Sequence, residues 1–461
     1  MRSVSVILAA GQGTRMKSTT PKVLHRLAGQ PLILYSVQTA TAISGELPVV
    51  VIGHAGDQVK AVVGDRARYA LQKEQLGTGH AVMQARDLLL GQADLVLVTY
   101  ADMPLLTEAT LQALVARHRE SQGAMTIVTV IAQDPRGFGR VLRDAAGRVR
   151  IVVEEAVATA EELRIRELNA GVYCFDADWL WANLPHIPIS PKGEYYLPDL
   201  VAIAVEQGSQ VNSVLCEDEN ELLGINTRVH LAEAEAALRT RITRYWMEAG
   251  VTITDPAITY IESAVTIGQD TTIWPNTHLL GHTKIGAGCS IGPGSLIQDC
   301  VIGDQCVVQM SVLEDAVMED NSRIGPFGHL RKGSRVCQGA HMGNFGEMKN
   351  STLGPGSKMG HFSYLGDTQA GSNVNIGAGA ITCNFDGERK QTTIIEDDAF
   401  IGSDSMLVAP LHIGRGAKTG AGSVVTHDVP DGALVMGVPA RVRRGGVTPP
   451  LRSTLRDRSE E

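Results

Sequence analysis

Residues suited to binding phosphate gather near the start of the chain. Gly11-Gln12-Gly13 follows a short apolar run, and two separated cations, Arg15 and Lys22, come soon after it. Glycines let backbone amides approach phosphate oxygens closely, and the cations supply charge to a polyanion. A dinucleotide fingerprint would need glycine in place of Met16, and a Walker loop would need Gly-Lys-Ser/Thr. The segment therefore predicts a phosphate-binding loop that is neither a dinucleotide-binding loop nor a Walker loop. The alternative is a purely structural turn.

A carboxylate stands at the end of an aliphatic run further along the chain. Asp102 closes the segment that begins at Leu95. Open α/β sheets place their ligands at the carboxyl ends of the strands. Alone, Asp102 is equally well explained as a capping residue of a turn or helix, so its role depends on the surrounding elements.

The elements that must position these residues alternate between two kinds over residues 1–227. The predicted strands are Val4–Leu8, Pro48–Ile52, Leu95–Thr99 and Met125–Ile131, and the predicted helices are Thr78–Leu90 and Thr107–Glu120. Near-continuous apolar strands that alternate with helices indicate a mostly parallel, helix-covered sheet. We therefore expect a Rossmann-like α/β domain here. The apolar start leads into the glycine loop without a convincing cleavage site, which favours a strand over a signal peptide.

One helix is predicted over residues 228–250. Its apolar residues fall at steps of three and four: Leu231, Ala234, Leu238, Ile242 and Trp246. Gly250 stands where a C-terminal cap belongs. We interpret this helix as a linker between two domains.

Beyond the helix, aliphatic residues recur every six positions. One series runs from Ile267 to Ile297, a second from Met318 to Met348 and a third from Ile395 to Val425. Neither a helix nor an ordinary strand keeps this period, which is typical of hexapeptide repeats. Residues 251–440 are thus predicted to form a left-handed parallel β-helix of roughly ten three-sided coils. The segment Thr382–Thr393 fits no hexapeptide and should loop out, and residues 441–461 are expected to be a mobile tail.

Composition limits the classes of function. The net charge of −9 over 461 residues argues against bulk nucleic-acid binding. Seven cysteines without a Cys-x-x-Cys pair suggest free thiols in a reducing cytoplasm. No apolar run approaches the roughly 18 residues of a membrane helix, so membrane insertion is not expected.

Several polar residues within the repeats are not required for building coils. They are Arg331, Lys349, His361, Tyr364 and Asn375. A lone histidine is more often structural than catalytic, but His361 stands among cations and amides. This combination predicts a second site in the C-terminal half.

Specific motifs resemble known enzymes. The run Leu8–Met16 followed by Pro21–Leu24 resembles the L-A-A-G-x-G-T-R-M…P-K-V-L motif of sugar-nucleotide pyrophosphorylases. Further segments agree in order: Gln72, Gln75–Ala81, Tyr100–Leu105, Gly137–Arg140, Glu154, Asn169–Gly171, Gly193–Leu197 and Gly224–Arg228. The resemblance covers essentially the whole chain. It is closest to the bifunctional N-acetylglucosamine-1-phosphate uridyltransferase/glucosamine-1-phosphate acetyltransferase family.

For the N-terminal half, the resemblance implies uridylyl transfer from UTP to N-acetylglucosamine-1-phosphate with release of pyrophosphate. Arg15 and Lys22 would stabilise the leaving pyrophosphate, and Asp102 and Asn226 would hold Mg²⁺. The residues implied to bind UTP and UDP-N-acetylglucosamine are Leu8, Ala9, Ala10, Gly11, Lys22, Gln72, Gly77, Thr78, Tyr100, Ala101, Asp102, Gly139, Glu154, Asn169 and Asn226.

For the C-terminal half, the resemblance implies acetyl transfer from acetyl-CoA to the amine of glucosamine-1-phosphate. His361 would be the general base, because a neutral imidazole can take an amine proton near pH 7. The residues implied to bind glucosamine-1-phosphate are Arg331, Lys349, Tyr364 and Asn375. The residues implied to bind acetyl-CoA are Ala378, Asn384, Phe385, Ser403 and Ala421. The resemblance also implies a homotrimer.

The chain departs from the family pattern at four places. Ala101 replaces a usual glycine, and Glu155–Ala158 lacks a Lys-Asp pair that often follows Glu154. Thr392 and Gly437 stand where some members carry a cation. These departures concern contacts to the sugar phosphates and to coenzyme A rather than the chemistry.

Two other interpretations remain open at this point. One is a pyrophosphorylase with a single activity, in which the β-helix only regulates or oligomerises. The other is a β-helical metalloenzyme of the carbonic anhydrase type that uses His329, His341 and His361. These histidines are 12 and 20 residues apart, so an 18-residue coil would not align them.

Overall fold

The computed structural model describes residues 2–121, 123–132, 134–135 and 137–443. Its internal contacts divide the chain into two compact units, Met1–Leu238 and Arg239–Glu461. Most of the tail predicted for residues 441–461 lies outside the described residues. Within the described part, no helix is both long enough and apolar enough to cross a membrane.

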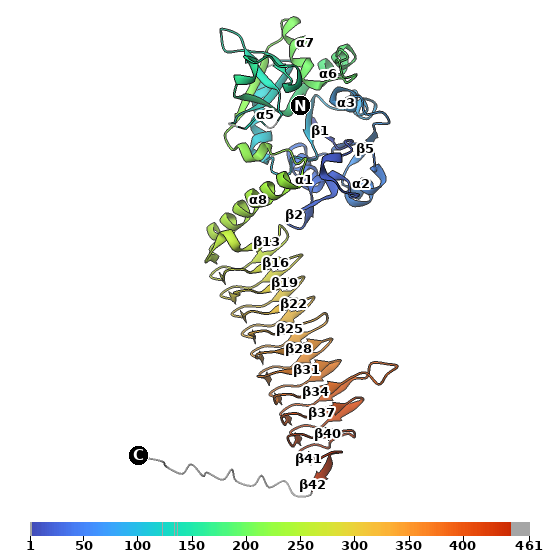
Figure 1. Ribbon diagram of the computed structural model, residues 1–461, viewed down its shortest axis with the longest axis vertical. Helices are drawn as coiled ribbons and strands as arrows, with labels where there is room; N and C mark the ends of the chain where they lie inside the picture. The colour runs from blue at the N-terminus through green and yellow to red at the C-terminus, as the bar shows by residue number, and fades with distance from the viewer. Residues whose placement is uncertain (1, 122, 133, 136, 444–461) are drawn as a thin grey trace, which may run out of the picture. The chain divides into compact units, whose positions relative to one another are not determined.

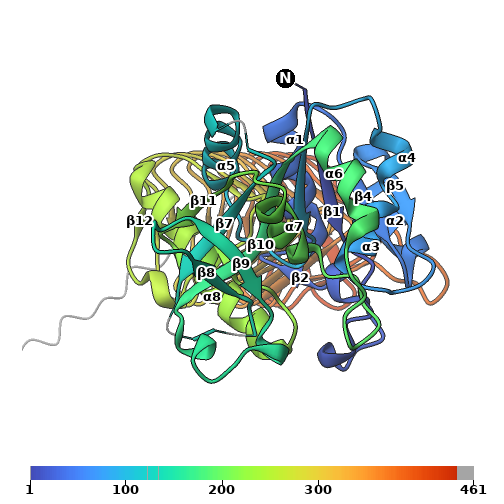
Figure 2. The same cartoon turned by 90° about the horizontal axis from the view of Figure 1, so that it is seen from above.

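The first unit is built on a nine-stranded sheet. The main order is β11 (Val211–Cys216), β7 (Met125–Ile131), β10 (Glu167–Asp176), β6 (Leu95–Tyr100), β1 (Ser3–Leu8), β4 (Val49–Ile52) and β5 (Arg68–Leu71), which Figure 2 shows from one side to the other. Strands β8 (Arg140–Arg143) and β9 (Val149–Val153) join the sheet through β10. Only β10 runs antiparallel to its two neighbours in the main order. The expected mostly parallel sheet is confirmed.

Helices cover both faces because successive strand residues point to opposite sides. Residues of α1 (Leu32–Ser44), α2 (Gly56–Val63) and α5 (Glu108–Ser121) pack on one face. Residues of α3 (Thr78–Met83), α6 (Ala177–Asn183) and α7 (Leu200–Glu206) pack on the other. The single helix expected over Thr78–Leu90 was wrong, because the backbone amides of Gln84 and Ala85 bond three residues back and separate α3 from α4 (Arg86–Leu89).

The helix α8 spans Arg228–Glu248 and belongs to both units. Ala234 is buried with Met16 and Leu27 in a cluster of the first unit. Ile242 and Trp246 pack against the core of the second unit. The boundary between the units therefore falls inside the helix rather than at its start.

The second unit is a parallel β-helix with three faces of twelve, ten and nine strands. Figure 1 shows the strands of the ten-stranded face one below another, from β13 (Tyr260–Ile261) to β40 (Val424–Val425). The inward residues stack in columns and are almost fully buried, as at Ile273, Ile291 and Val308. The expected left-handed β-helix of hexapeptide repeats is confirmed by this architecture.

Coil length varies, which explains why the period of six is interrupted. Ile273 pairs with Ile291, Ile291 with Val308 and Val308 with Ile324, so successive coils hold 18, 17 and 16 residues. Shortened corners between Ile297 and Met318 shift the repeat without moving any inward side chain.

Two segments differ from a regular coil. Residues 384–392 project between β34 (Ile381–Cys383) and β35 (Thr393–Ile395) (Figure 1). The expected loop is therefore present but shorter than Thr382–Thr393, because Thr382, Cys383 and Thr393 belong to the strands. The predicted mobile tail begins with a strand, β42 (Arg441–Arg443), which pairs antiparallel with β41 (Leu434–Met436). The first tail residues thus cover the last coil, where the outer strand of the twelve-stranded face offers unpaired backbone groups.

Candidate active sites

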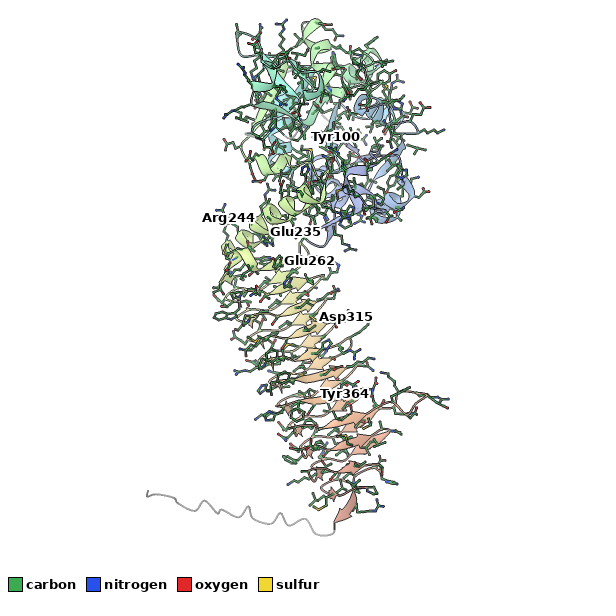
Figure 3. All side chains as sticks on the ribbon, viewed as in Figure 1. Tyr100, Glu235, Arg244, Glu262, Asp315 and Tyr364 are labelled. Carbon is green, nitrogen blue, oxygen red and sulfur yellow. The ribbon has the colours of Figure 1, made fainter. Side chains whose placement is uncertain are left out.

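A cavity of about 490 Å³ opens beside the carboxyl ends of β1 and β6. Eleven of the sequence-predicted residues line it: Leu8, Ala9, Ala10, Gly11, Arg15, Lys22, Gln72, Gly77, Thr78, Tyr100 and Asp102. The position agrees with the rule that open α/β sheets bind ligands at strand carboxyl ends. Tyr100 is labelled in Figure 3.

The glycine loop is shaped by the lysine that follows it. Gly13 has a φ of 64°, and a Cβ atom there would lie 2.5 Å from the Cβ of Lys22. Only glycine can therefore let the lysine stem pass so close to the loop. This contact directs the Lys22 ammonium towards the cavity.

Three other polar side chains gather near that ammonium. Lys22 Nζ contacts the Asp102 carboxylate and donates to Asn226 Oδ1 at 3.0 Å. The Arg15 guanidinium donates to the same Asn226 oxygen at 3.0 Å. Residues separated by more than 200 positions in the sequence thus form one cluster, of which Arg15, Lys22 and Asp102 line the cavity.

The oxygens of Asp102 and Asn226 converge on a single cation. A carboxylate and an amide oxygen are hard ligands, and Mg²⁺ commonly takes one or two protein ligands together with phosphate oxygens. The donor set therefore fits Mg²⁺. Among the described residues, no group of three or more His, Cys, Asp or Glu is arranged to hold a metal.

A second cavity of about 290 Å³ shares Thr78, Tyr100 and Asp102 with the first. The predicted residues Gly139, Glu154, Asn169 and Asn226 line it. Asn169 donates from Nδ2 to the Tyr173 hydroxyl at 2.7 Å, which fixes the amide. Two adjoining cavities with a common carboxylate can place two phosphate-bearing ligands end to end.

The carboxyl group of Glu154 is not in an ordinary environment. Burial raises its pKa, and the negative charge of Asp199 raises it further, while Lys192 acts in the opposite direction. Burial also raises the pKa of Asp199. The second cavity therefore holds a carboxylate that takes up a proton more readily than an exposed glutamate does.

Ala101 does not line either cavity. Its side chain is fully buried in a cluster with Ala9, Val23 and Ile33. The extra methyl group relative to glycine thus enters the apolar core between the sheet and α1, and the structure does not place its side chain in the nucleotide site.

The segment Glu155–Ala158 also lies outside both cavities. Glu155 accepts a hydrogen bond at 3.0 Å from the buried guanidinium of Arg140. That pair ties the end of β9 to the start of β8. The missing Lys-Asp pair is therefore replaced by residues that stabilise the loop beside Glu154.

Some lining residues were not singled out as ligands from the sequence. They are Gln75 and Glu194 in the first cavity, and Met103, Phe138, Tyr173, Tyr196 and Pro198 in the second. Gln75 donates from Nε2 to the Ala10 carbonyl at 2.8 Å. Most of them lie inside the motif segments, so their proximity in sequence to the predicted ligands could have identified them.

In the second unit, four predicted residues share one edge of the β-helix. This edge, which we call the His361 edge, contains His361, Ala378, Ser403 and Ala421 in successive coils. Backbone amides join the coils there: Gly379 donates to Phe362, Asp404 to Ala378 and Gly422 to Ser403, at 2.6 to 2.8 Å. The predicted base and three coenzyme residues are thus aligned.

Two cations lie at strand ends of the adjoining ten-stranded face, and a third comes from the projecting loop. The Arg331 amide bonds to the Met348 carbonyl, which places Arg331 beside Lys349 in the next coil. Lys390, from the projecting loop, contacts Lys349 and lowers its pKa, and Arg331 adds to this effect. Lys390 was not predicted as a ligand. Cations that repel one another at close range indicate a place for an anion.

Tyr364 lies on β31 (Ser363–Gly366) of the same face (Figure 3), and Asn375 lies on β33 (Asn375–Ile376) of the twelve-stranded face. The five predicted coenzyme residues are not all together. Ala378 precedes β34, whereas Asn384 and Phe385 follow it. Asn384 instead donates to Asp367 at 2.5 Å.

The structure gives a local explanation for the two remaining departures from the family pattern, at Gly437 and Thr392. Gly437 has a φ of 103°, a conformation that disfavours any other residue. Thr392 is exposed, and its carbonyl accepts from the Leu411 amide.

The three histidines of the metalloenzyme interpretation do not form a column. His329 lies in β25 (His329–Leu330) of the ten-stranded face, and His341 lies in β27 (His341–Met342) of the twelve-stranded face. His361 follows β30 (Lys358–Met359) at the edge between those faces. The arrangement therefore contradicts a shared metal site.

Comparison with known proteins agrees with two functional halves. Residues 5–169 match the family described as a MobA-like NTP transferase domain. Residues 264–299 match the bacterial transferase hexapeptide (six repeats), and residues 392–427 match the hexapeptide repeat of succinyl-transferase.

Curated relatives match almost the full length of the chain. The "Bifunctional protein GlmU" of Heliobacterium modesticaldum is 50% identical over 436 residues, which cover 94% of this chain and 95% of the relative. Proteins of the same name from a Geobacillus species and from Exiguobacterium sibiricum are each 46% identical over 94–95% of this chain and 95–97% of their own length.

Proposed function

The chain belongs to the family of bifunctional GlmU proteins, and from this premise we propose which of its residues carry each reaction. The protein is a bifunctional enzyme of UDP-N-acetylglucosamine synthesis. It acetylates glucosamine-1-phosphate and then transfers a uridylyl group from UTP to the product. The observation that carries this conclusion is the high identity over 94% of the chain, across both units.

In the first unit, the 490 Å³ cavity receives UTP and the 290 Å³ cavity receives the sugar phosphate. Their shared residues bring the sugar phosphate oxygen to the α-phosphorus, so catalysis is chiefly positioning. Arg15 and Lys22 offset the charge that develops on the departing pyrophosphate. Glu154 and Asn169 hold sugar hydroxyls and amide.

Asp102 and Asn226 are the proposed Mg²⁺ ligands, supported by their convergence on one cation. When bound, Mg²⁺ supplies positive charge to the phosphate oxygens. Lys22 contacts the same two oxygens, so we propose that its ammonium would offset phosphate charge next to the metal ligands.

In the second unit, Arg331, Lys349 and Lys390 hold the phosphate of glucosamine-1-phosphate. His361 takes a proton from the amine as the amine nitrogen bonds to the acetyl carbon and the coenzyme thiolate leaves. The exposed backbone of the His361 edge binds the coenzyme. The Ala378 amide can stabilise the oxyanion.

We propose that the protein acts as a homotrimer, which its hexapeptide repeats support. We also propose a cytoplasmic location, supported by seven free cysteines and by the use of UTP and acetyl-CoA. In the described residues, the cysteine side chains are buried or half-buried.

One coupled assay tests the function. Purified protein receives glucosamine-1-phosphate, acetyl-CoA, UTP and Mg²⁺, and UDP-N-acetylglucosamine is measured. The expected product requires all four additions. Product from N-acetylglucosamine-1-phosphate and UTP, with none from glucosamine-1-phosphate and acetyl-CoA, would favour the single-activity alternative.

A further inference from the structure

The projecting loop, residues 384–392, carries one of the cations proposed to bind the sugar phosphate. This cation is Lys390, which contacts Lys349 at the end of β28 (Gly346–Lys349). Two ammonium groups repel each other at such close range. The loop must therefore hold Lys390 in place against this repulsion, and the position of Lys390 depends on what stabilises the loop.

Burial contributes little to the shape of this loop. Residues 385–390 are all exposed, and the side chain of Phe385 is 60% exposed. The base of the loop is anchored on one residue: Asn384 donates from Nδ2 to Asp367 Oδ2 at 2.5 Å, and the Thr393 amide donates to the Asp367 carbonyl at 3.2 Å. These contacts fix the two ends of the loop and leave its tip to be shaped by other interactions.

The tip is shaped by the carboxylate of Asp386. Its Oδ1 accepts hydrogen bonds from the backbone amides of Glu388 at 2.8 Å and Arg389 at 2.7 Å, and its Oδ2 accepts from Gln391 Nε2 at 2.8 Å. These hydrogen bonds, led by that from the Arg389 amide, lower the pKa of Asp386 to about 2. The carboxylate is therefore ionised at any pH at which the enzyme would be assayed. One side chain thus joins the two sides of the turn.

The same carboxylate determines where Lys390 lies. Lys390 stands between Arg389 and Gln391, and both of these residues donate to Asp386. Without these hydrogen bonds, the repulsion from Lys349 would favour loop conformations in which the two ammonium groups are further apart. The pair of cations that faces the phosphate therefore depends on Asp386.

We propose that Asp386 is a positioning residue for acetyl transfer, which acts by holding Lys390 where it binds the phosphate of glucosamine-1-phosphate. This inference rests on the function proposed for the second unit. If the loop opens, only the molecules that keep Lys390 in place bind the substrate tightly, and the apparent affinity falls in proportion. Because His361 lies outside the loop, the effect on KM should exceed the effect on kcat.

The test compares two full-length variants that make the same change in charge. Asp386→Ala removes the carboxylate that shapes the loop. Glu388→Ala removes a second exposed carboxylate of the loop, which makes no hydrogen bond or ion pair with any described residue. KM for glucosamine-1-phosphate should rise about tenfold in Asp386→Ala, as for a loop closed in about a tenth of the molecules, and stay within about twofold in Glu388→Ala. Equal KM values for the two variants would overturn the proposal.

Uridylyl transfer by the same preparations is the internal control for folding, because its proposed residues lie in the first unit. A conservative variant then identifies the interaction. Asp386→Asn keeps a side-chain oxygen that can accept from the same backbone amides, so its KM should lie within about threefold of the wild-type value. A KM as high as that of Asp386→Ala would show that these hydrogen bonds do not shape the loop.

A double-mutant cycle shows whether Asp386 acts through Lys390. Lys390→Ala should raise KM by itself. The double variant Asp386→Ala/Lys390→Ala should have the same KM as Lys390→Ala, because positioning has no effect once the positioned group is absent. If the two increases in KM instead multiply, Asp386 acts by another route and the proposal is wrong.

Hydrogen exchange followed by mass spectrometry reports on the loop without an activity assay. Exchange over residues 384–391 should be faster in Asp386→Ala than in Glu388→Ala, since two amides lose their acceptor. Equal exchange rates would contradict the proposal. A wild type that transfers acetyl groups, with an unchanged KM in Asp386→Ala, would refute the positioning role and leave the proposed function standing. A wild type without acetyl transfer would instead refute the proposed function.

Discussion

At the scale of single residues, each proposed site contains a lysine in direct contact with other polar side chains. Lys22 joins Asp102 to Asn226 in the first unit, while Lys390 lies against Lys349 in the second. These contacts link positions far apart in sequence. Three predictions concern single residues: a general base, a metal ligand and a buried carboxyl group.

The first concerns the general base. His361→Ala should lower kcat for acetyl transfer by roughly 10²–10⁴-fold, with a smaller change in KM, because proton removal is lost while the phosphate-binding cations remain. Uridylyl transfer serves as the internal control. A folded, trimeric variant that acetylates within about threefold of wild type would identify His361 as structural.

The second concerns the metal ligands. Asp102→Ala should abolish uridylyl transfer and leave acetyl transfer near normal, because its carboxylate lies in the first unit only. The direct readout is Mn²⁺ binding in the presence of UTP, followed by electron paramagnetic resonance. Unchanged Mn²⁺ affinity in a folded variant would require a different ligand.

The third concerns pH. Burial and Asp199 raise the pKa of Glu154, so its ionised form is lost at a higher pH than in an ordinary glutamate. As the pH falls, KM for N-acetylglucosamine-1-phosphate should therefore rise early. Asp199→Asn removes a negative charge, lowers that pKa and should move the rise to lower pH. A KM profile that Asp199→Asn leaves in place would show that Glu154 does not control sugar binding.

At the scale of elements, α8 is the instructive case. Its N-terminal half contributes Ala234 and Leu231 to a cluster of the first unit, and Glu235 accepts from the Ala28 amide at 2.9 Å. A fragment cut at the start of the helix would therefore expose apolar surface. The helix is therefore a structural part of the first unit as well as the connection between the two units.

This gives a prediction about fragments. Residues 1–238 should retain uridylyl transfer and lose acetyl transfer, whereas residues 1–227 should be less stable by a few kcal/mol, since a buried aliphatic side chain contributes about 1.5–3 kcal/mol. Thermal unfolding of the two fragments compares them directly. If a folded 1–238 fragment has no uridylyl transfer, the assignment of that reaction to the first unit is wrong.

At the scale of the whole molecule, the two reactions have different requirements. The uridylyl site is lined by residues of one unit of one chain. The proposed coenzyme residues Ala378 and Asn384 stand on either side of β34, and His361 is exposed. Acetyl transfer should therefore depend more on the oligomeric state than uridylyl transfer does.

Dilution should separate the two activities. As the protein is diluted below the concentration at which the proposed trimer dissociates, specific acetyl-transfer activity should fall while specific uridylyl-transfer activity stays constant. Mass photometry at each concentration supplies the oligomeric state. Parallel loss of both activities would indicate general instability rather than a requirement for assembly.

The sequence by itself determined the features that follow from local order. A period of six can bury one side chain per short strand only in a coil, so Ile267 to Ile297 sufficed to predict the β-helix. The glycine loop, Asp102 and the motif segments likewise indicated a nucleotide site at strand ends, since parallel strands end on the same edge of a sheet.

Only the tertiary structure decided which distant residues meet. Ala101 turned out to be buried in the core, Lys390 reaches Lys349 from a projecting loop, and α8 belongs to both units. A coil of 17 residues, from Lys358 to Asn375, aligns His361 with Ala378, whereas coils elsewhere hold 16 or 18 residues. Such alignments depend on the sum of many corners and on packing between segments, and neither quantity is encoded in any short stretch of sequence.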